Sequence, residues 1–351
     1  METDARLMHA RSTPLPLVDL SPFVAGGGDR RSTGAALRQA AREFGFFYCT
    51  GHGVRPQLLE RLQRQAALFF AQDLETKLEI AMARGGRAWR GYFPVGQELT
   101  SGRPDQKEGL YFGAELPAEH PKVRAGLPLH GANLFPELSG FRATVLEYIE
   151  ALTHVGHRLM EAVALSLGLD SHYFHERYTR DPLVLFRIFH YPPVTGDVPS
   201  DRSADAWGVG EHTDYGLLTI LAQDSVGGLE VRTRDGWVDA APLPGAFVCN
   251  LGDMLERMTG GFYCSTPHRV RSESQHGRLS FPFFFDPAFD AAIQPIELDL
   301  IDDAARDGGT RAEDRGERWD GASVHDLTGT YGEYLLGKVS KVFPELGGER
   351  L

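Results

Sequence analysis

The 351-residue sequence predicts a mainly β protein with flanking helices (α+β), in which N-terminal helices buttress a jelly roll, or double-stranded β-helix. Three observations predict this fold class. Apolar residues recur at helical spacing in the first half of the chain, whereas short apolar runs separated by turn residues follow Pro182. In addition, 42% of the residues are hydrophobic, which is enough for a large core. We therefore expect one compact unit.

The first half contains the predicted helices. Residues 15–21 form the first expected strand, residues 33–48 a helix ending in a short aromatic strand, and residues 57–70 a second helix. The longest helical pattern covers residues 139–168, with Ser139 as the expected N-cap and Gly168 as the stop. Gly and Pro punctuate residues 90–105, which predicts an irregular loop. Together these elements predict an N-terminal helical region over residues 1–180.

The second half contains the predicted strands. Short apolar runs occur at residues 183–191, 216–223, 228–233, 236–240, 246–253, 268–272, 278–286 and 292–298. Several strands at this spacing are typical of an antiparallel sandwich or barrel. We expect the jelly-roll core at residues 181–301, a polar mobile loop at 302–322, and a closing helix within 323–351.

Charge and cysteine content argue against several classes of partner. The formal net charge of −12 disfavours nucleic acid and anionic membranes. No run reaches the roughly 18 apolar residues of a membrane-spanning helix, and the N-terminus lacks the apolar centre of a secretory signal. The three cysteines form no C-x-x-C motif, which indicates reduced thiols. These features predict a cytoplasmic protein and leave the oligomeric state open.

The motif His212-x-Asp214 places an imidazole and a carboxylate two residues apart. In an extended segment such residues share a face. A third ligand from the β region would complete a metal site, with His190, His268 and His276 as candidates; His268 is favoured because it follows Pro267 and begins a strand-like run. Two histidines and one carboxylate are typical of non-haem Fe(II) oxygenases, whereas a structural zinc site would favour four ligands with sulfur prominent.

A second pair, Arg278 and Ser280, also shares a face if its strand forms. A guanidinium and a hydroxyl together suit a carboxylate, because the guanidinium donates parallel hydrogen bonds. The order along the sequence is His-x-Asp, then a single His, then Arg-x-Ser. This order is more informative than any of the motifs alone.

In these residues the protein resembles the isopenicillin-N-synthase-like 2-oxoglutarate/Fe(II)-dependent oxygenases. The resemblance covers nearly the whole sequence: "LPLVDLSPF", "AAREFGFFYCTGHGV" and "ALFFAQDLETKLEI" in the first half, then "FHYPP", "HTDYGLLTILAQDSVGGLEV", "NLGDMLERMTGGFYCSTPHRV" and "GRLSFPFFFDP". It implies a jelly-roll catalytic core and an enzyme that uses Fe(II), 2-oxoglutarate and O₂. The expected reaction is oxidation, most simply hydroxylation, of a small-molecule substrate with release of succinate and CO₂.

The resemblance also implies roles for individual residues. His212, Asp214 and His268 are the implied iron ligands and catalytic residues. Arg278 and Ser280 are implied to bind the distal carboxylate of 2-oxoglutarate, with Tyr191 beside that cosubstrate. Two positions depart from the family pattern, because Phe189 replaces a frequent Asn and His190 a frequent Tyr.

Other outcomes stay open. The stretches "GQELTSGRPD", "HTDYGLL" and "AQDSVGGL" resemble the ethylene-forming branch of the family. The same cofactors could therefore support desaturation, cyclisation or ethylene formation. A catalytically silent jelly-roll binding module and a zinc-dependent hydrolase are further alternatives, which the complete set of motifs disfavours.

Substrate-binding residues are expected in the punctuated loop "GYFPVGQELTSGRPD". The resemblance to the ethylene-forming branch implies that Glu98 and Thr100, with Lys341 of the closing helix, line the mouth of the iron site. His190 and Tyr215 are expected beside them. A carboxylate and an ammonium group there would suit a small polar or zwitterionic substrate.

Overall fold

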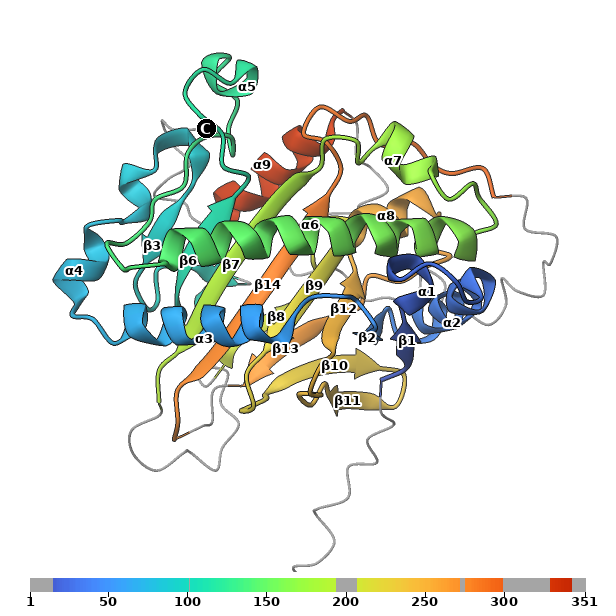
Figure 1. The fold of residues 1–351 in the computed structure, drawn as a ribbon, viewed down its shortest axis with the longest axis horizontal. Helices are drawn as coiled ribbons and strands as arrows, with labels where there is room; N and C mark the ends of the chain where they lie inside the picture. Colours follow the sequence, from blue (N-terminus) through green and yellow to red (C-terminus); the bar gives the residue numbers. More distant parts are fainter. Residues whose placement is uncertain (1–14, 101, 194–206, 272–274, 299–328, 343–351) are drawn as a thin grey trace, which may run out of the picture.

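The computed structural model describes residues 15–100, 102–193, 207–271, 275–298 and 329–342. The polar loop expected at residues 302–322 lies outside the described residues. Two facing β-sheets form the centre of the molecule, and helices cover the outer face of the larger sheet (Figure 1). The mainly β architecture with flanking helices is as predicted.

The second half of the protein forms the jelly roll, and its strands are divided between the two sheets. The larger sheet contains the order β12-β9-β14-β7 and the smaller sheet the order β11-β10-β13-β8. These strands are β7 (Leu183–Tyr191), β8 (Trp207–His212), β9 (Leu218–Gln223), β10 (Leu229–Thr233), β11 (Gly236–Asp239), β12 (Phe247–Leu251), β13 (His268–Arg271) and β14 (Arg278–Asp286). The sequence pattern missed β8, because glycines at 208 and 210 interrupt its apolar alternation.

The first half supplies strands as well as helices. It extends the larger sheet at both edges with β1 (Leu17–Asp19) and β2 (Phe46–Thr50) next to β12, and with β6 (Glu108–Gly113) and β3 (Gly91–Phe93) next to β7. The prediction that residues 90–105 form an irregular loop is therefore wrong in part. It contains β3 and a separate pair, β4 (Leu99–Thr100) with β5 (Arg103–Pro104). Gly102, with a φ of +74°, allows the tight reversal between them.

The prediction of a strand at residues 292–298 is also wrong. This segment makes only an isolated bridge between Ala292 and Thr330 among the described residues. Pro295 lacks an N–H donor and so weakens any ladder there.

Helices pack on the outer face of the larger sheet (Figure 1). The main ones are α2 (Arg30–Glu43), α3 (Pro56–Phe70) and α6 (Phe141–Ser166); shorter segments are α1 (Ser21–Val24), α4 (Leu74–Leu78), α5 (Pro121–Arg124), α7 (Tyr173–Arg177), α8 (Asp253–Met258), and the 3₁₀ turns η1 (Met82–Arg84) and η2 (Gly86–Ala88). The N-cap of α6 is Gly140, with a φ of +78°, and not Ser139 as expected. Its C-cap is Leu167, followed by Gly168 with a φ of +77°.

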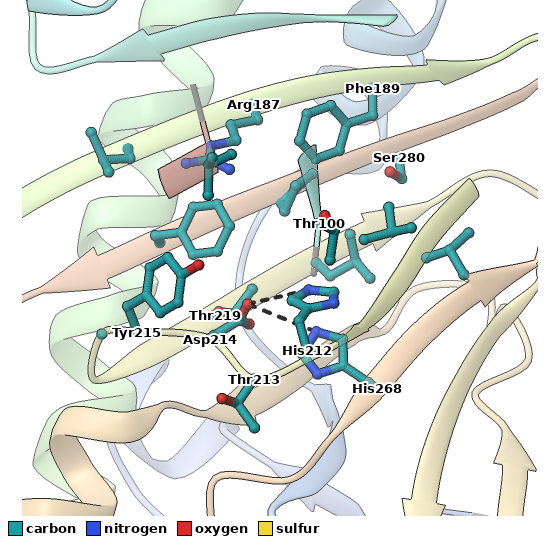
Figure 2. Close-up of a pocket in the computed structure, with 18 of the residues that line it drawn as sticks. Thr100, Arg187, Phe189, His212, Thr213, Asp214, Tyr215, Thr219, His268 and Ser280 are labelled. Atoms are coloured by element: carbon teal, nitrogen blue, oxygen red, sulfur yellow. Dashed lines mark hydrogen bonds and ion pairs between the residues drawn. The ribbon is translucent and has the colours of Figure 1, made fainter. Parts of the chain in front are cut away.

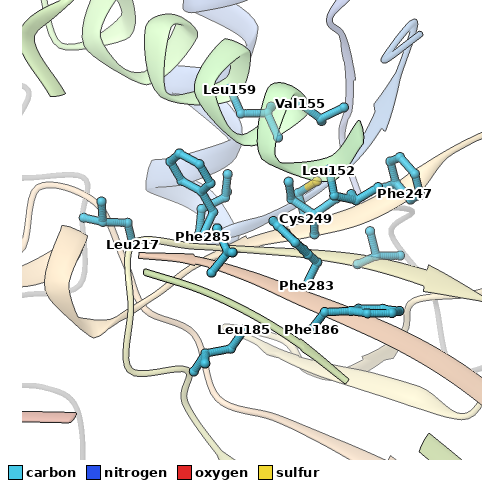
Figure 3. Close-up of a cluster of buried hydrophobic side chains, with 14 of the residues drawn as sticks. Leu152, Val155, Leu159, Leu185, Phe186, Leu217, Phe247, Cys249, Phe283 and Phe285 are labelled. Carbon is cyan, nitrogen blue, oxygen red and sulfur yellow. The ribbon is translucent and has the colours of Figure 1, made fainter. Parts of the chain in front are cut away.

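The core between α6 and the larger sheet is aromatic and aliphatic (Figure 3). Leu152, Val155 and Leu159 of α6 are buried against the sheet, where Phe283 and Phe285 of β14 are also fully buried. Alternation along β14 then directs Ser280, Pro282 and Phe284 to the opposite, inner face. This packing determines which side chains of the larger sheet face the smaller sheet.

The last described helix, α9 (Tyr331–Val342), contacts β4. Within the described part of the protein, no helix is both long and apolar enough to cross a lipid bilayer.

The free energy of unfolding is expected to depend on the protonation of His157 on α6. Its ring packs edge-on against Phe285 at 4.9 Å. Burial, with a smaller contribution from His175, lowers the pKa of His157 to about 4. As the pH falls from about 6.5 to about 4, the unfolded protein therefore binds a proton that the folded protein does not, and stability is lost. Allowing for partial exposure, we expect a loss of about 1–3 kcal/mol over this range.

Urea unfolding of wild type and His157→Gln at pH 7 and pH 5 measures this effect. The variant should lose less stability than wild type on acidification. The matched control is His172→Gln, an exposed histidine that is not among the groups that shift the pKa of His157. Parallel pH dependences for wild type and His157→Gln would contradict the assignment.

Candidate active site

Three potential metal ligands converge between the two sheets (Figure 2). His212 ends β8, His268 begins β13 as its partner in the strand pairing, and Asp214 lies two residues beyond the end of β8. Nε2 of His212 lies 3.8 Å from Oδ1 of Asp214, and Nε2 of His268 lies 3.7 Å from the same oxygen. The three ligand atoms lie within 4.8 Å of one another, so one metal ion could contact all of them.

Backbone carbonyls orient both histidines toward this point. Nδ1 of His212 lies 2.8 Å from the carbonyl oxygen of Gly210, and Nδ1 of His268 lies 3.2 Å from that of Thr266. If each Nδ1–H donates to its carbonyl, each Nε2 keeps a free lone pair directed at the shared centre. This is the tautomer that metal binding requires.

The two carboxylate oxygens of Asp214 have different partners. Oδ2 accepts hydrogen bonds from Thr219 Oγ1 at 2.5 Å and from Asn250 Nδ2 at 2.7 Å. Oδ1 faces the two histidines. Since Oδ2 is already engaged, the arrangement favours a metal contact through one oxygen.

The protonation states also suit a metal. Burial, followed by the proximity of His268, lowers the pKa of His212 to about 4, so its ring is neutral near pH 7. Burial opposes ionisation of Asp214, but His268, His212 and the hydrogen bonds from Asn250 and Thr219 together lower the pKa of that carboxyl. Neutral imidazole and ionised carboxylate are the forms that bind metals.

The cluster lines a cavity of about 130 Å³ between the sheets. Arg278, Ser280 and Tyr191 line the same cavity, as predicted from the sequence. Arg278 of β14 pairs with Tyr191 of β7, and its guanidinium carbon lies 4.7 Å from the centre of the Tyr191 ring.

Arg278 has unused hydrogen-bonding capacity. The residue is 3% exposed, and Nη2 donates to Gln223 Oε1 at 3.2 Å. Nε and Nη1 are buried without a hydrogen-bond partner. Leaving such donors unpaired is costly, and a carboxylate is the acceptor that a guanidinium binds best. The residues present therefore fit a carboxylate-bearing cosubstrate beside a metal.

Three of the five expected substrate residues reach the cavity. Glu98, Thr100 and Tyr215 line it together with the metal cluster. His190 does not: on β7, alternate residues Arg187, Phe189 and Tyr191 face the cavity, so His190 faces the other side. There its ring lies 2.8 Å from Glu108 and stacks on Phe70.

Lys341 is not a lining residue either. Tyr331, Leu335, Val339 and Val342 of α9 line the cavity, which places Lys341 outside that helical face, and it is exposed. The expectation that it joins the pocket was based on resemblance and did not consider the phase of the helix.

The sequence interpretation missed other polar residues that line the cavity, namely Lys107, Tyr111, Arg187, Thr219, Asn250 and Asp286. Asp286 accepts a hydrogen bond of 2.6 Å from the Tyr331 hydroxyl and so connects β14 to α9; burial raises its pKa to about 7. Arg187 could have been found, because it lies four residues before Tyr191 on one strand and so shares its face. The others depend on contacts between distant segments.

Two family models match most of the sequence. One, described as the 2OG-Fe(II) oxygenase superfamily, matches residues 182–287. The other, described as the N-terminal part of a non-haem dioxygenase in morphine synthesis, matches residues 15–138.

Named relatives are similar over almost their full length. A probable iron/ascorbate oxidoreductase of Dictyostelium discoideum is 47% identical, over 95% of this protein and 95% of the relative. A 1-aminocyclopropane-1-carboxylate oxidase of Dictyostelium mucoroides is 37% identical, over 94% of this protein and 95% of the relative. A homoarginine-6-hydroxylase of Oryza sativa subsp. japonica is 36% identical, over 93% and 96%.

A solved structure agrees with these relatives. A full-length Neurospora crassa protein, crystallised in complex with alpha-KG (2-oxoglutarate) and thymine, superposes with a TM-score of 0.74 at 27% identity, over 93% of the protein described here and 96% of its own length. Sequence, fold and the buried His-Asp-His cluster thus agree. The protein belongs to the 2-oxoglutarate/Fe(II)-dependent oxygenase superfamily, and is an oxidoreductase that uses Fe(II), 2-oxoglutarate and O₂ to oxidise a small molecule.

Proposed function

We propose that His212, Asp214 and His268 hold the Fe(II), and that Arg278 and Ser280 bind the distal carboxylate of 2-oxoglutarate with Tyr191 beside it. When bound, the iron and its cosubstrate supply the oxidising chemistry, with release of succinate and CO₂. The protein's own residues bind, orient and shield the reactants. The unpaired Nε and Nη1 of Arg278, buried in the same cavity as the His-Asp-His cluster, are the observation that carries this proposal.

The surroundings of the cavity support the protein's part in this reaction. Asp214 keeps one oxygen free because Thr219 and Asn250 bind the other. Leu335 and Val339 of α9 place apolar groups on the cavity wall, and the bond from Tyr331 to Asp286 holds that helix in place. Such a wall limits access of water to the reacting groups.

Hydroxylation is the proposed outcome. The similarity to a homoarginine-6-hydroxylase supports it. The second candidate outcome, oxidation with ring chemistry or ethylene release, is favoured by the similarity to a 1-aminocyclopropane-1-carboxylate oxidase. Arg278 weighs only against a reaction that uses no 2-oxo acid, because its unpaired donors suit a cosubstrate with a distal carboxylate.

Product analysis after anaerobic loading with Fe(II) separates these outcomes. On admission of O₂, a hydroxylase should convert 2-oxoglutarate to equal amounts of succinate and CO₂, and the headspace should contain no ethylene. Ethylene formed from 2-oxoglutarate would establish the alternative. No consumption of 2-oxoglutarate with any tested substrate would instead indicate a silent binding module.

We also propose that the protein acts in the cytoplasm and as one compact unit. Cys49, Cys249 and Cys264 are buried and form no disulfide within the described part of the protein, which supports a reducing compartment. The larger sheet, which joins strands from both halves of the sequence, supports a single unit.

A further inference from the structure

A second arginine, Arg187 of β7, faces the same cavity as Arg278. The two lie far apart along the sheet, because Arg278 pairs with Tyr191, four residues beyond Arg187. Four residues of a strand span roughly 13 Å. Figure 2 places Arg187 on the side of the cavity nearer Tyr215 and away from Ser280. The two side chains therefore start from well-separated points of the sheet.

Arg187 also has a hydrogen-bond donor without a partner. Its guanidinium stacks on Tyr111, with 4.1 Å from the guanidinium carbon to the ring centre, and on Phe284 at 4.9 Å. These rings fix the orientation of the guanidinium plane. Nη1 lies 3.5 Å from Glu98 Oε1, a long contact, and Nε is buried without a hydrogen-bond partner. The proposed binding of 2-oxoglutarate to Arg278 does not account for this donor.

Glu98 supplies the complementary acceptor. The residue is 4% exposed, and Oε1 accepts a 2.6 Å hydrogen bond from the Tyr111 hydroxyl. Oε2 lies 3.0 Å from Lys107 Nζ but accepts no well-aligned hydrogen bond. Burial opposes ionisation of Glu98, yet Lys107 and Arg187 hold the pKa of its carboxyl below the usual value. An ionised carboxylate, whose Oε2 is held by the ion pair with Lys107, therefore faces the cavity beside Arg187.

The charges of this cluster balance. Lys107 also contacts Asp105, which in turn accepts a 2.8 Å hydrogen bond from Thr100. Two cations, Lys107 and Arg187, thus accompany two carboxylates, Glu98 and Asp105. A ligand with a net charge would unbalance a buried cluster at considerable cost. A ligand with one anionic and one cationic group would satisfy both Arg187 and Glu98 without adding net charge.

We infer that the substrate is a free α-amino acid with an uncharged side group, whose carboxylate binds Arg187 and whose ammonium group binds Glu98. The inference rests on the proposed function and identifies its substrate class. Phe284, which stacks on Arg187, and Leu335 and Val339 of α9 add apolar groups to the cavity wall, which suit an uncharged side group. In the balanced reaction one oxygen atom of O₂ converts a C–H bond of that side group to C–OH, and the other enters succinate as 2-oxoglutarate loses CO₂.

The test is substrate-stimulated succinate formation by the Fe(II)-loaded full-length protein over a panel of L-amino acids. At least one uncharged amino acid should stimulate the rate more than about tenfold, in the range that one charge-assisted contact supplies. Its decarboxylated amine and its deaminated acid should each stimulate at least about tenfold less, since each lacks one of the two charged groups.

Variants locate the contacts. Arg187→Gln and Glu98→Gln should each raise the amino acid concentration for half-maximal rate about 30-fold or more, as expected when one partner of a buried charged pair is lost. Anaerobic binding of 2-oxoglutarate to the Fe(II) form, followed by its charge-transfer absorption, should change less than about twofold. The control is Arg232→Gln, an exposed arginine whose ion pair with Glu211 lies outside the cavity lining; it should behave as wild type.

Each other result has a definite meaning. Stimulation only by cationic amino acids, by amines, or by uncharged heterocycles would overturn the inference while the proposed function stands. Loss of 2-oxoglutarate binding in Arg187→Gln would also overturn it, because Arg187 would then belong to the cosubstrate site. If the wild-type protein binds no 2-oxoglutarate with Fe(II), the proposed function itself fails. Should Arg187→Gln not fold, Glu98→Gln and the analogue series still decide.

Discussion

Replacing His268 by alanine is expected to reduce 2-oxoglutarate turnover by more than about 100-fold, because even partners that only orient a metal ligand contribute about 10–100-fold. Nε2 of His268 lies 3.7 Å from Oδ1 of Asp214. Among the described residues that line the cavity, the only histidines are His212 and His268. The fold should survive, since strand pairing through the backbone of β13 does not need the imidazole. Succinate formation at saturating Fe(II) measures the effect.

The control for this prediction is His276→Ala. Sequence alone left His276 open as a third ligand, but the residue is exposed. Turnover in this variant should remain within about twofold of wild type, as is usual for surface substitutions. Full consumption of 2-oxoglutarate by His268→Ala would show that the ligand set is wrong.

Replacing Arg278 by alanine is expected to raise the KM for 2-oxoglutarate by about 30-fold to several thousand-fold. A buried charged pair that loses one partner costs about 2–5 kcal/mol, and each 1.4 kcal/mol corresponds to about tenfold. Ser280→Ala removes a single hydroxyl and should cost about 1 kcal/mol, or roughly fivefold. Steady-state kinetics with varied 2-oxoglutarate give both values.

The ratio of these two effects is informative. Arg278 presents two unpaired donors to the cavity, whereas Ser280 offers one hydroxyl. A KM for Arg278→Ala equal to that of wild type would exclude the arginine from the cosubstrate site. An effect of Ser280→Ala as large as that of Arg278→Ala would mean that the hydroxyl, and not the guanidinium, dominates recognition of the carboxylate.

Much of the site was predictable because it depends on local rules. Residues two apart on a strand share a face, so Arg278 with Ser280 could be placed from the sequence, and both line the cavity. His212 and Asp214 converge as expected, although Asp214 lies beyond the end of β8 rather than within it. The choice of His268 over His276 came from Pro267 and the strand-like run after it, and the pairing of β13 with β8 places His268 opposite His212.

The same local rules would have corrected two errors. Tyr191 faces the cavity, so its neighbour His190 must face away, and Arg187 must face inward. Lys341 similarly falls off the face of α9 that Leu335, Val339 and Val342 define. In both cases the periodicity of the element decides which side chains face the cavity.

Other features could not be predicted from local patterns. The strands β1, β2, β3 and β6 are short, and they gain their stability by joining the edges of a sheet built mainly from the second half of the sequence. The buried cluster of Glu98, Lys107 and Arg187 brings together three separate segments. Such features depend on tertiary contacts, which no window of sequence contains.

Anomalous diffraction at the iron absorption edge, from crystals grown anaerobically with Fe(II) and 2-oxoglutarate, tests the central assignment most directly. We predict one strong iron peak bounded by Nε2 of His212, Oδ1 of Asp214 and Nε2 of His268, with a carboxylate of 2-oxoglutarate hydrogen-bonded to Arg278. An iron peak away from these three atoms, or 2-oxoglutarate bound without contact to Arg278, would contradict the account.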